Sequence, residues 1–284
     1  MISKNSTHIK QRIKQQFSSS AQNYDSKAGF QKKIAEELLN YIVPQLADCN
    51  LQLATILDIG CGTGFLTIPL AETFSNVKVY AIDIAHPMVK TARLKTRESQ
   101  FFLTADCDSL PYKNCQFDLL ASSLTYQWSG NLDTAFKEAH RILEKGGMFA
   151  FSMLGQKTFK ELRECYKEAS HISNKNGLPP FMNFHSEDNV ISKLKKTGFS
   201  GTSCLVDLKI EHYPNMLELL RTLKTIGAGN PFDSRDKNLG KGQILKKMAE
   251  IYQKKFKSLS HDSHLTSHGC IYATYEVMFF TARK

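Results

Sequence analysis

The sequence predicts an α/β fold in which helices cover both faces of a mostly parallel, seven-stranded sheet. Strand-like apolar runs alternate with helix-like segments through the first half of the 284-residue chain, and this alternation is typical of parallel sheets. The segment 55–65 leads from an apolar run into a helix-like stretch through three alternate glycines. A chain of this length suits one large domain with a small insertion.

The first half contains the elements that would position a ligand. We expect strands at 55–59, 77–82, 99–106, 117–123 and 148–153, and helices at 66–74, 87–96 and 132–143. The residues Lys145, Gly146 and Gly147 are expected to end the last of these helices. Ligands of such sheets bind where the strands end. Asp58, Asp83, Asp106 and Ser123 all fall at expected strand ends, so one crevice can collect them.

Beyond residue 154 the alternation loosens. We expect helices at 157–170 and 186–197, a loop at 176–180, and strands at 205–210 and 271–282, of which the last is apolar enough to be interior. Two helical segments, 216–226 and 243–256, bracket the loop 227–231. They form an expected insertion at about 213–262, placed as a lid. The N-terminal segment 1–40 is expected to close over the site, with the main domain at 41–284.

Composition excludes several classes of protein. No run of about 18 apolar residues is present, which argues against a membrane span, and the basic N-terminus lacks the apolar core of a secretory signal. The seven cysteines are scattered without a C-x-x-C pair, as in a reducing compartment. We therefore expect a cytoplasmic protein. The formal net charge of +10 favours an acidic macromolecular partner, although solvated lysines alone would also account for it.

The glycine spacing distinguishes two nucleotide ligands. A dinucleotide fingerprint, G-x-G-x-x-G, would need a third glycine where Phe65 stands. The pattern that starts at Asp58 is instead Asp-x-Gly-x-Gly-x-Gly, and a second acidic residue, Asp83, ends the next strand. This resembles motif I of the class I S-adenosylmethionine-dependent methyltransferases, whose fold is Rossmann-like. An acid in the turn suits a sulfonium and aminocarboxylate head group, and an acid after the second strand suits ribose hydroxyls.

The resemblance implies S-adenosylmethionine as the cofactor and a set of residues that bind it. Met88 would pack against the adenine, and Asp106 would accept a hydrogen bond from the adenine amine. No metal is expected, because His261, His264 and His268 stand in a polar loop without a ligand pattern around them. The expected cofactor-binding residues are Asp58, Gly60, Cys61, Gly62, Gly64, Asp83, Ile84, Met88, Asp106, Cys107 and Ser123.

Three further stretches resemble one narrower family, the malonyl-[acyl-carrier-protein] O-methyltransferases of biotin synthesis. They are 17–24 (Phe-Ser-Ser-Ser-Ala-Gln-Asn-Tyr), 122–128 (Ser-Ser-Leu-Thr-Tyr-Gln-Trp) and 220–228 (Leu-Arg-Thr-Leu-Lys-Thr-Ile-Gly-Ala). Ser123 departs from the pattern, since relatives often have asparagine there. The resemblance implies methylation of the free carboxyl of a malonyl group on a phosphopantetheine arm. The methyl ester masks the charge, so that fatty-acid synthesis can elongate the chain toward pimeloyl.

A carboxylate is already ionised at neutral pH, so this reaction needs position, desolvation and a counter-charge but no general base. Arg221, in an otherwise apolar helical segment, is the candidate partner of the substrate carboxylate because arginine pairs with carboxylates through two points. Tyr24 would close over the site, and Gln127 would orient the substrate. A surface arginine on an amphipathic helix and a tyrosine that only packs are the alternative interpretations. Trp128 suits a pocket wall.

Acyl carrier proteins are acidic, so a basic rim would steer such a partner. Lysines gather in the later part of the chain, at 193, 195, 196, 237, 241, 246, 247, 254, 255 and 257. A nucleic acid is not expected, because no RNA-binding motif with stacking aromatics accompanies the charge. Other functions remain open at this point. They are methylation of another small carboxylic acid or a quinone precursor, a cofactor-binding assembly factor that transfers no methyl, and an RNA methyltransferase.

Overall fold

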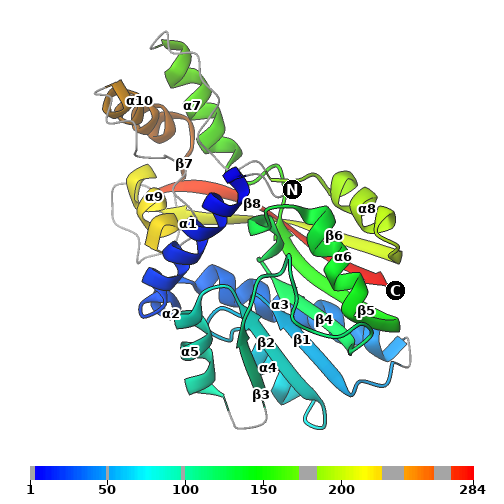
Figure 1. Ribbon diagram of the computed structural model, residues 1–284. Coiled ribbons are helices and arrows are strands. Elements are labelled where there is room, and N and C mark those ends of the chain that lie inside the picture. The colour runs from blue at the N-terminus through cyan, green and yellow to red at the C-terminus, as the bar shows by residue number, and fades with distance from the viewer. Residues whose placement is uncertain (1–3, 49–50, 97–99, 173–183, 226–239, 259–269) are drawn as a thin grey trace. The chain divides into compact units, whose positions relative to one another are not determined.

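The computed structural model describes residues 4–48, 51–96, 100–172, 184–225, 240–258 and 270–284 (Figure 1). Its helices are α1 (Lys4–Ser20), α2 (Tyr24–Lys27), α3 (Gly29–Asp48), α4 (Thr67–Thr73), α5 (His86–Lys95), the 3-10 helix η1 (Tyr126–Trp128), α6 (Leu132–Ile142), α7 (Lys160–Ile172), α8 (Glu187–Lys196), α9 (Met216–Thr225) and α10 (Gly240–Lys255). Its strands are β1 (Thr55–Ile59), β2 (Lys78–Asp83), β3 (Gln100–Thr104), β4 (Phe117–Ser123), β5 (Leu143–Leu154), β6 (Ser200–Tyr213), β7 (Lys257–Ser258) and β8 (Cys270–Arg283).

The sheet confirms the predicted fold class. Its strands follow the order β3-β2-β1-β4-β5-β8-β6, and the two-residue β7 pairs with β8 outside this path. The pairs β1–β2, β1–β4, β2–β3 and β4–β5 are parallel. In this order the chain first runs outward from β1 to β3 and then returns to β4 on the other side of β1. The gap between the ends of β1 and β4 is therefore the topological switch point at which such sheets bind ligands.

The chain divides into two compact units. The first comprises 1–154, 185–206 and 278–284, and the second comprises 155–184 and 207–277. The expected helical insertion at about 213–262 falls in the second unit, together with 155–184, a segment of the expected main domain 41–284. The long strands β6 and β8 contribute residues to both units.

The first unit has an aromatic and aliphatic core. Helices α4 and α5 pack on β2, α3 packs on β4 and β5, and α6 packs on β5, so helices lie on both faces (Figure 1). Tyr126, Phe136, Phe149 and Phe151 are fully buried and contact one another through ring pairs with centroids 4.6–5.9 Å apart. Because the interior strands are apolar on both faces, their side chains fill the space beneath the helices. This core fixes the strand ends that carry the candidate site.

The second unit is built around a helix pair. Helix α7 packs against α10, and α10 packs against α9. Leu162 and Cys165 of α7 and Met248 and Tyr252 of α10 are buried. The Tyr252 hydroxyl donates to the backbone oxygen of Tyr272 at 2.9 Å. The helices expected at 157–170 and 243–256 thus pack against each other as α7 and α10.

The helix predicted at 132–143 ends within one residue of its predicted end, but the role predicted for Lys145, Gly146 and Gly147 as a helix stop was wrong. Helix α6 ends at Ile142, and the residues Lys145–Gly147 lie inside β5. The pairing of β4 with β5 begins at Phe117 opposite Leu143 and shifts register before Leu119. Gly146, at φ +77°, donates its N–H to the Lys284 oxygen at 3.0 Å. The glycine pair therefore forms an irregular part of a strand and does not stop a helix.

The outcomes of the remaining predicted segments differ. The loops at 176–180 and 227–231 and the histidines 261, 264 and 268 lie outside the described residues. The helix expected at 186–197 is confirmed as α8, and Ser186 is its N-cap, because the Ser186 hydroxyl accepts the N–H of Asn189. Strand β6 is longer at both ends than the predicted 205–210. Among the described helices, none has the length and apolar character needed to cross a membrane.

Candidate functional site

The turn between β1 and α4 is shaped by its glycines. Gly60, Gly62 and Gly64 have φ values of +78°, +53° and +96°, a region that side chains rarely enter. The N–H groups of Gly60 and Cys61 both donate to the Ile82 oxygen, at 2.7 and 2.8 Å. At Gly60 a Cβ would lie 2.1 Å from Oγ1 of Thr125. Only glycine fits there, so the turn is held tightly against the ends of β2 and β4.

Asp58 has a buried carboxyl group with one open oxygen. It is fully buried, and its Oδ2 accepts the hydroxyl of Thr67 at 2.6 Å. Its Oδ1 is buried without a hydrogen-bond partner among the described residues. Burial, assisted by the charge of Asp83, raises the pKa of Asp58 to about 7. An unpaired buried acceptor costs about 1–3 kcal/mol, so this atom is suited to a ligand that donates a hydrogen bond.

Asp83 is held in place by the backbone. Its Oδ2 accepts the N–H of Gly62 at 2.9 Å, and its Oδ1 accepts the N–H of Ala85 at 2.8 Å. Burial raises its pKa to about 6, although both hydrogen bonds act in the opposite direction. Each oxygen retains a second lone pair. The carboxylate is therefore oriented before any ligand arrives, next to the half-buried Ile84 in the same turn.

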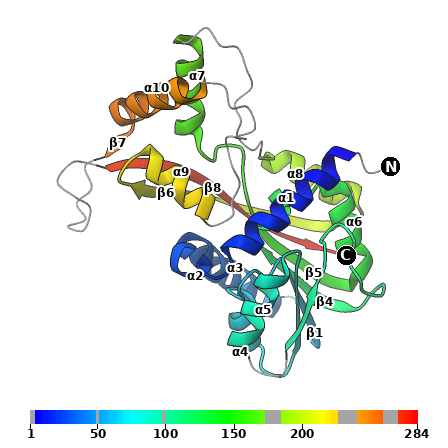
Figure 2. The ribbon, with the colours of Figure 1, turned by 60° about the vertical axis from the view of Figure 1, so that its left-hand side comes forward.

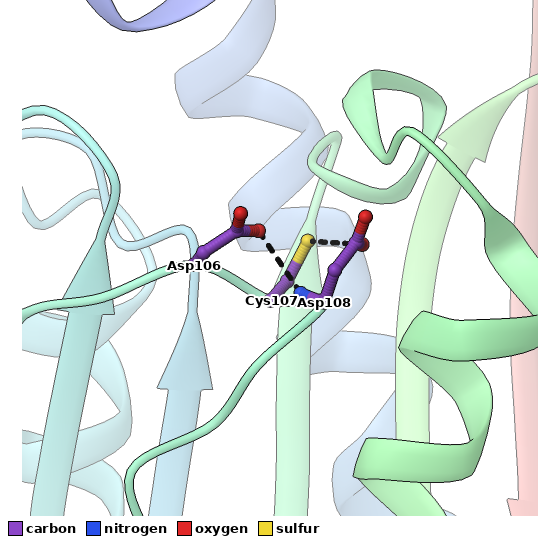
Figure 3. A group of neighbouring side chains, drawn as sticks. All are labelled: Asp106, Cys107 and Asp108. Carbon is purple, nitrogen blue, oxygen red and sulfur yellow. Dashed lines mark hydrogen bonds between the residues drawn. The ribbon is translucent and has the colours of Figure 1, made fainter. Parts of the chain in front are cut away.

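The loop after β3 holds a group of acids and a thiol (Figure 3). Asp106 Oδ1 accepts the N–H of Asp108 at 3.0 Å, and the Cys107 thiol donates to Asp108 Oδ1 at 3.5 Å. Burial raises the pKa of Cys107. Their ligand atoms lie within 4.8 Å of one another, as in a metal site. However, the ammonium of Lys10 lies 2.5 Å from a carboxylate oxygen of Asp106 and 2.6 Å from one of Asp108. This positive charge already offsets the negative charges of the two carboxylates.

The end of β4 carries further polar groups. Ser123 shares a hydrogen bond with Ser152 of β5, with 3.3 Å between the hydroxyl oxygens. The next residue, Leu124, has φ +51°, and strained residues of this kind concentrate at functional sites. The half-buried Gln127 in η1 has its Oε1 buried without a partner among the described residues. Gln127 Oε1 is therefore a second buried acceptor without a partner among the described residues, in addition to Asp58 Oδ1.

Tyr24 and Met88 lie where the N-terminal helices pack on α5. Met88 is buried in a cluster with Ala21 and Ala85, against which Tyr24 and Phe17 pack. The Tyr24 ring lies 6.0 Å from that of Phe65. Burial, assisted by the charges of Asp83 and Asp25, raises the pKa of Tyr24 above its usual value. Tyr24 is therefore a neutral hydroxyl near the Asp83 carboxylate, and its expected role stays a prediction.

Arg221 belongs to the second unit. Met216, Leu219 and Leu223 form the buried face of α9, and Arg221 projects from the opposite face with 71% of its side chain exposed. It pairs with Glu218 one turn earlier. This pairing accounts for the arginine within its own helix, and its proposed contact with a substrate stays a prediction.

Three residues at the site were not predicted from the sequence. Thr67 binds Asp58, Thr125 packs against Gly60, and Lys10 binds Asp106 and Asp108. Thr67 had a local signal, since a hydroxyl in the first helical turn after a glycine-rich loop is well placed to reach back to the strand. Lys10 had none, because its partners are about a hundred residues away in the sequence.

These acceptors match the donors of S-adenosylmethionine, the cofactor implied by the glycine motif. The cofactor carries an ammonium group, two ribose hydroxyls and an adenine amine. The first unit provides the open oxygen of Asp58, the fixed carboxylate of Asp83, and Asp106. The bare turn at Gly60–Gly64 leaves room for a ligand to lie against the backbone. The residues present therefore fit the group.

Comparison with known proteins gives the same assignment. The family description "Methyltransferase domain" matches residues 57–151. A protein of Geobacter sulfurreducens named malonyl-[acyl-carrier protein] O-methyltransferase is 32% identical over 249 residues, which are 87% of this chain and 92% of that protein. A protein of the same name from Acetivibrio thermocellus is 32% identical over 96% of this chain and 93% of its own.

A solved structure has the same fold. The YcgJ protein of Bacillus subtilis superposes with a TM-score of 0.57 at 16% identity, over 88% of this chain and 98% of that one. The glycine turn, the acids at the strand ends and the family match all fall on the same five strands. The chain belongs to the same family as the Geobacter sulfurreducens and Acetivibrio thermocellus proteins, and this family is one of S-adenosylmethionine-dependent methyltransferases.

Proposed function

We propose that this methyltransferase esterifies the free carboxylate of a malonyl group held as a thioester on an acyl carrier protein. The observation that carries the proposal is the similarity, over more than nine-tenths of their lengths, to two proteins named for this reaction. The stretches 17–24, 122–128 and 220–228 resemble the same family. The product, a malonyl methyl ester, would enter biotin synthesis as the start of pimeloyl.

The chemistry suits the groups at the site. When bound, S-adenosylmethionine supplies an electrophilic methyl group whose transfer converts the sulfonium into a neutral thioether. A malonyl carboxylate is ionised near pH 7, so the protein has to orient and desolvate it and does not have to deprotonate it. A carboxylate only accepts hydrogen bonds, so Gln127 would bind it through the N–H groups of its side-chain amide and not through Oε1. Exclusion of water by Tyr24 and Trp128 would strengthen the hydrogen bonds between Gln127 and the carboxylate.

Arg221 is the proposed counter-charge for the carboxylate. Its ion pair with Glu218 is exposed, and exposed pairs contribute at most about 1 kcal/mol, so a substrate carboxylate in a drier setting can replace it. One carboxylate oxygen has to stay free of the guanidinium, because a tightly held oxygen is a poor nucleophile.

The proposed partner is acidic, and part of the expected basic rim is already neutralised. Lys193 and Lys196 pair with Asp133, and Lys255 pairs with Glu164 and Glu168. Lys195, Lys246, Lys254 and Lys257 are exposed, whereas the side chains of Lys237 and Lys241 lie outside the described residues. We therefore propose that the carrier contacts Lys195, Lys246, Lys254 and Lys257 in preference to the lysines that already form ion pairs.

A radiolabel assay tests the proposal. The purified protein is given methyl-labelled cofactor and either malonyl-carrier, malonyl-coenzyme A or acetyl-carrier, and both the ester and S-adenosylhomocysteine are measured. We expect labelling of the malonyl thioesters and at least 100-fold less labelling of acetyl-carrier, which has no free carboxylate. Equal labelling of all thioesters would contradict the proposal. Cofactor binding without turnover on any of them would indicate an assembly factor.

Arg221→Ala separates carboxylate from phenolic substrates. Loss of a charge-assisted contact costs about 1.5–3 kcal/mol, so we expect malonyl methylation to fall by roughly 10- to 150-fold. Lys224→Ala removes an exposed positive charge from the same helix and is the matched control. A quinone precursor as the true substrate would be methylated equally by both variants.

A further inference from the structure

Helices α1 and α2, residues 4–27, contact segments that carry the candidate cofactor-binding residues of the first unit; we call these two helices the strap. Figures 1 and 2 show the strap beside α5, with which α1 is in contact. Ile13, Ser20 and Ala21 are buried, whereas Ile9 remains 54% exposed. Phe17 and Tyr24 pack against the cluster of Ala21, Ala85 and Met88. The strap is held by this apolar packing and by a few specific contacts along its length.

One contact is ionic and stands at the adenine end of the site. The Lys10 ammonium bridges Asp106 and Asp108, and its side chain is only 20% exposed. Burial acts to lower the pKa of Lys10, but the hydrogen bonds to Asp106 and Asp108 and their negative charges together outweigh burial and raise it. Without this cation the two carboxylates would repel each other at close range. The Lys10 ammonium therefore offsets this repulsion and holds α1 beside the two acids.

The other contacts lie further along the strap. Phe17 meets Trp128 edge to face, with ring centroids 5.6 Å apart and planes at 84°. Asp25 accepts the Thr63 hydroxyl at 2.6 Å and pairs with Lys95. Thr63 belongs to the glycine turn, and Lys95 to the last turn of α5. The strap is thus tied to four segments that carry candidate site residues or adjoin them: η1, the glycine turn, α5 and the loop after β3.

We propose that Lys10 fastens the strap over the bound cofactor, and that Asp106 serves both the Lys10 ammonium and the adenine amine. Asp106 Oδ2 faces Lys10 with one lone pair, and a carboxylate oxygen can accept a second hydrogen bond. Closure of the strap and binding of the adenosine are then coupled through one carboxylate. Cofactor leaves only after Lys10 lets go. Lys10 is accordingly a positioning residue, because it acts through Asp106.

The test needs no acyl acceptor. It rests on the proposed placing of the cofactor alone, so failure of the malonyl proposal would leave it valid. Trp128 is the only tryptophan in the chain and touches the strap through Phe17, so its fluorescence reports strap closure. We would measure the dissociation rate of S-adenosylhomocysteine by stopped-flow fluorescence, and the hydrogen exchange of α1 amides with and without this ligand.

Lys10→Met removes the charge and keeps most of the length of the side chain. We expect dissociation about tenfold faster, because loss of one partner of a desolvated ion pair acts mainly on the off-rate. We also expect faster exchange of the α1 amides and loss of the salt dependence of the off-rate. Lys10→Arg should restore most of the slow release. Lys14→Met, at an exposed position of the same helix, should leave the rate unchanged.

Two results would overturn the proposal. An unchanged off-rate in Lys10→Met, with normal protection of α1, would show that the ion pair does not hold the strap. Tighter binding by Lys10→Met would show that Lys10 competes with the adenine instead of closing over it. Thermal unfolding of each variant identifies any general loss of structure, which would also appear in amides outside α1.

Discussion

Asp58 in the first unit and Glu161 in the second are both fully buried carboxyl groups, but they differ in how their oxygens are satisfied. In the second unit, Glu161 accepts both the N–H and the hydroxyl of Thr274, and Glu276 accepts the N–H of Lys157 at 2.8 Å. In the first unit, Asp58 is equally buried but has one oxygen without a partner among the described residues. A buried carboxyl whose partners come from its own chain stabilises the fold. One with an open oxygen marks the place where a ligand completes the structure.

The largest effect on cofactor affinity should come from replacing the carboxyl group that has the open oxygen. Asp58→Asn keeps an acceptor for Thr67 but removes the charge that faces the ligand. We expect the affinity for S-adenosylhomocysteine to fall by about 100-fold, the value of a lost charge-assisted contact, with little change in stability. Isothermal calorimetry and thermal unfolding measure the two quantities.

Glu161→Ala is the matched variant in the second unit. It leaves the buried N–H of Thr274 without an acceptor, at a cost of about 1–3 kcal/mol, plus the cost of the space it empties. Cofactor affinity should stay within twofold of the unaltered protein. If Glu161→Ala weakened binding as much as Asp58→Asn did, the distinction between the two units would be wrong.

A second prediction concerns the glycine turn. Gly60→Ala places a methyl group 2.1 Å from Oγ1 of Thr125 at a φ of +78°. The backbone strain alone is about 1–2 kcal/mol, and the collision adds to it, so we expect a total loss of about 2–4 kcal/mol of stability. Denaturant unfolding measures this loss.

Gly62→Ala is the control for the collision. It also has a positive φ, +53°, but a Cβ there meets nothing within 4 Å, so only the strain of about 1–2 kcal/mol is expected. Adding Thr125→Ala to Gly60→Ala should recover part of the loss. Equal losses for the two glycine variants would refute the close packing of Thr125 against the turn.

The third prediction is a pH dependence. Burial raises the pKa of Asp58 to about 7 and that of Asp83 to about 6. Because a ligand that donates hydrogen bonds prefers the ionised acids, its affinity should fall as the pH drops from 8 to 5. Below a given pKa the fall approaches about tenfold per pH unit for each acid that has to ionise. Calorimetry across this range measures it, and Asp58→Asn should remove the part near pH 7.

Stability without ligand should change in the opposite direction. Both acids have folded pKa values above their unfolded values, so the folded state binds more protons than the unfolded state between about pH 4 and pH 7. Their contribution to stability is fully present below pH 4 and is lost as the pH rises through the folded pKa values. Affinity and unliganded stability that moved together with pH would contradict these assignments.

The local parts of this site could be predicted from the sequence. Interior parallel strands are apolar runs that end in polar residues, so β4 was placed at its observed bounds, 117–123, and Asp58 and Asp83 at strand ends. The edge strand β6 was predicted too short, because the residues that it adds at its two ends, 200–204 and 211–213, are mostly small or polar. The contact of Lys10 with Asp106 spans 96 residues. Such a contact depends on where a whole helix docks, which no short pattern encodes.

The smallest expected effect lies in the second unit. The hydroxyls of Tyr213 and Tyr275 are 2.7 Å apart, and burial raises the pKa of Tyr213 to about 12, so both stay neutral. Tyr213→Phe should cost about 1 kcal/mol of stability, the net value of one hydrogen bond. Chemical denaturation of both single variants and of the double variant gives their coupling energy. Cofactor affinity should not change, since this pair is satisfied within its own unit, as Glu161 is. A measurable loss of affinity from so small a change would mean that the second unit also senses the ligand, and the division between a ligand-completed unit and a self-completed one would have to be abandoned.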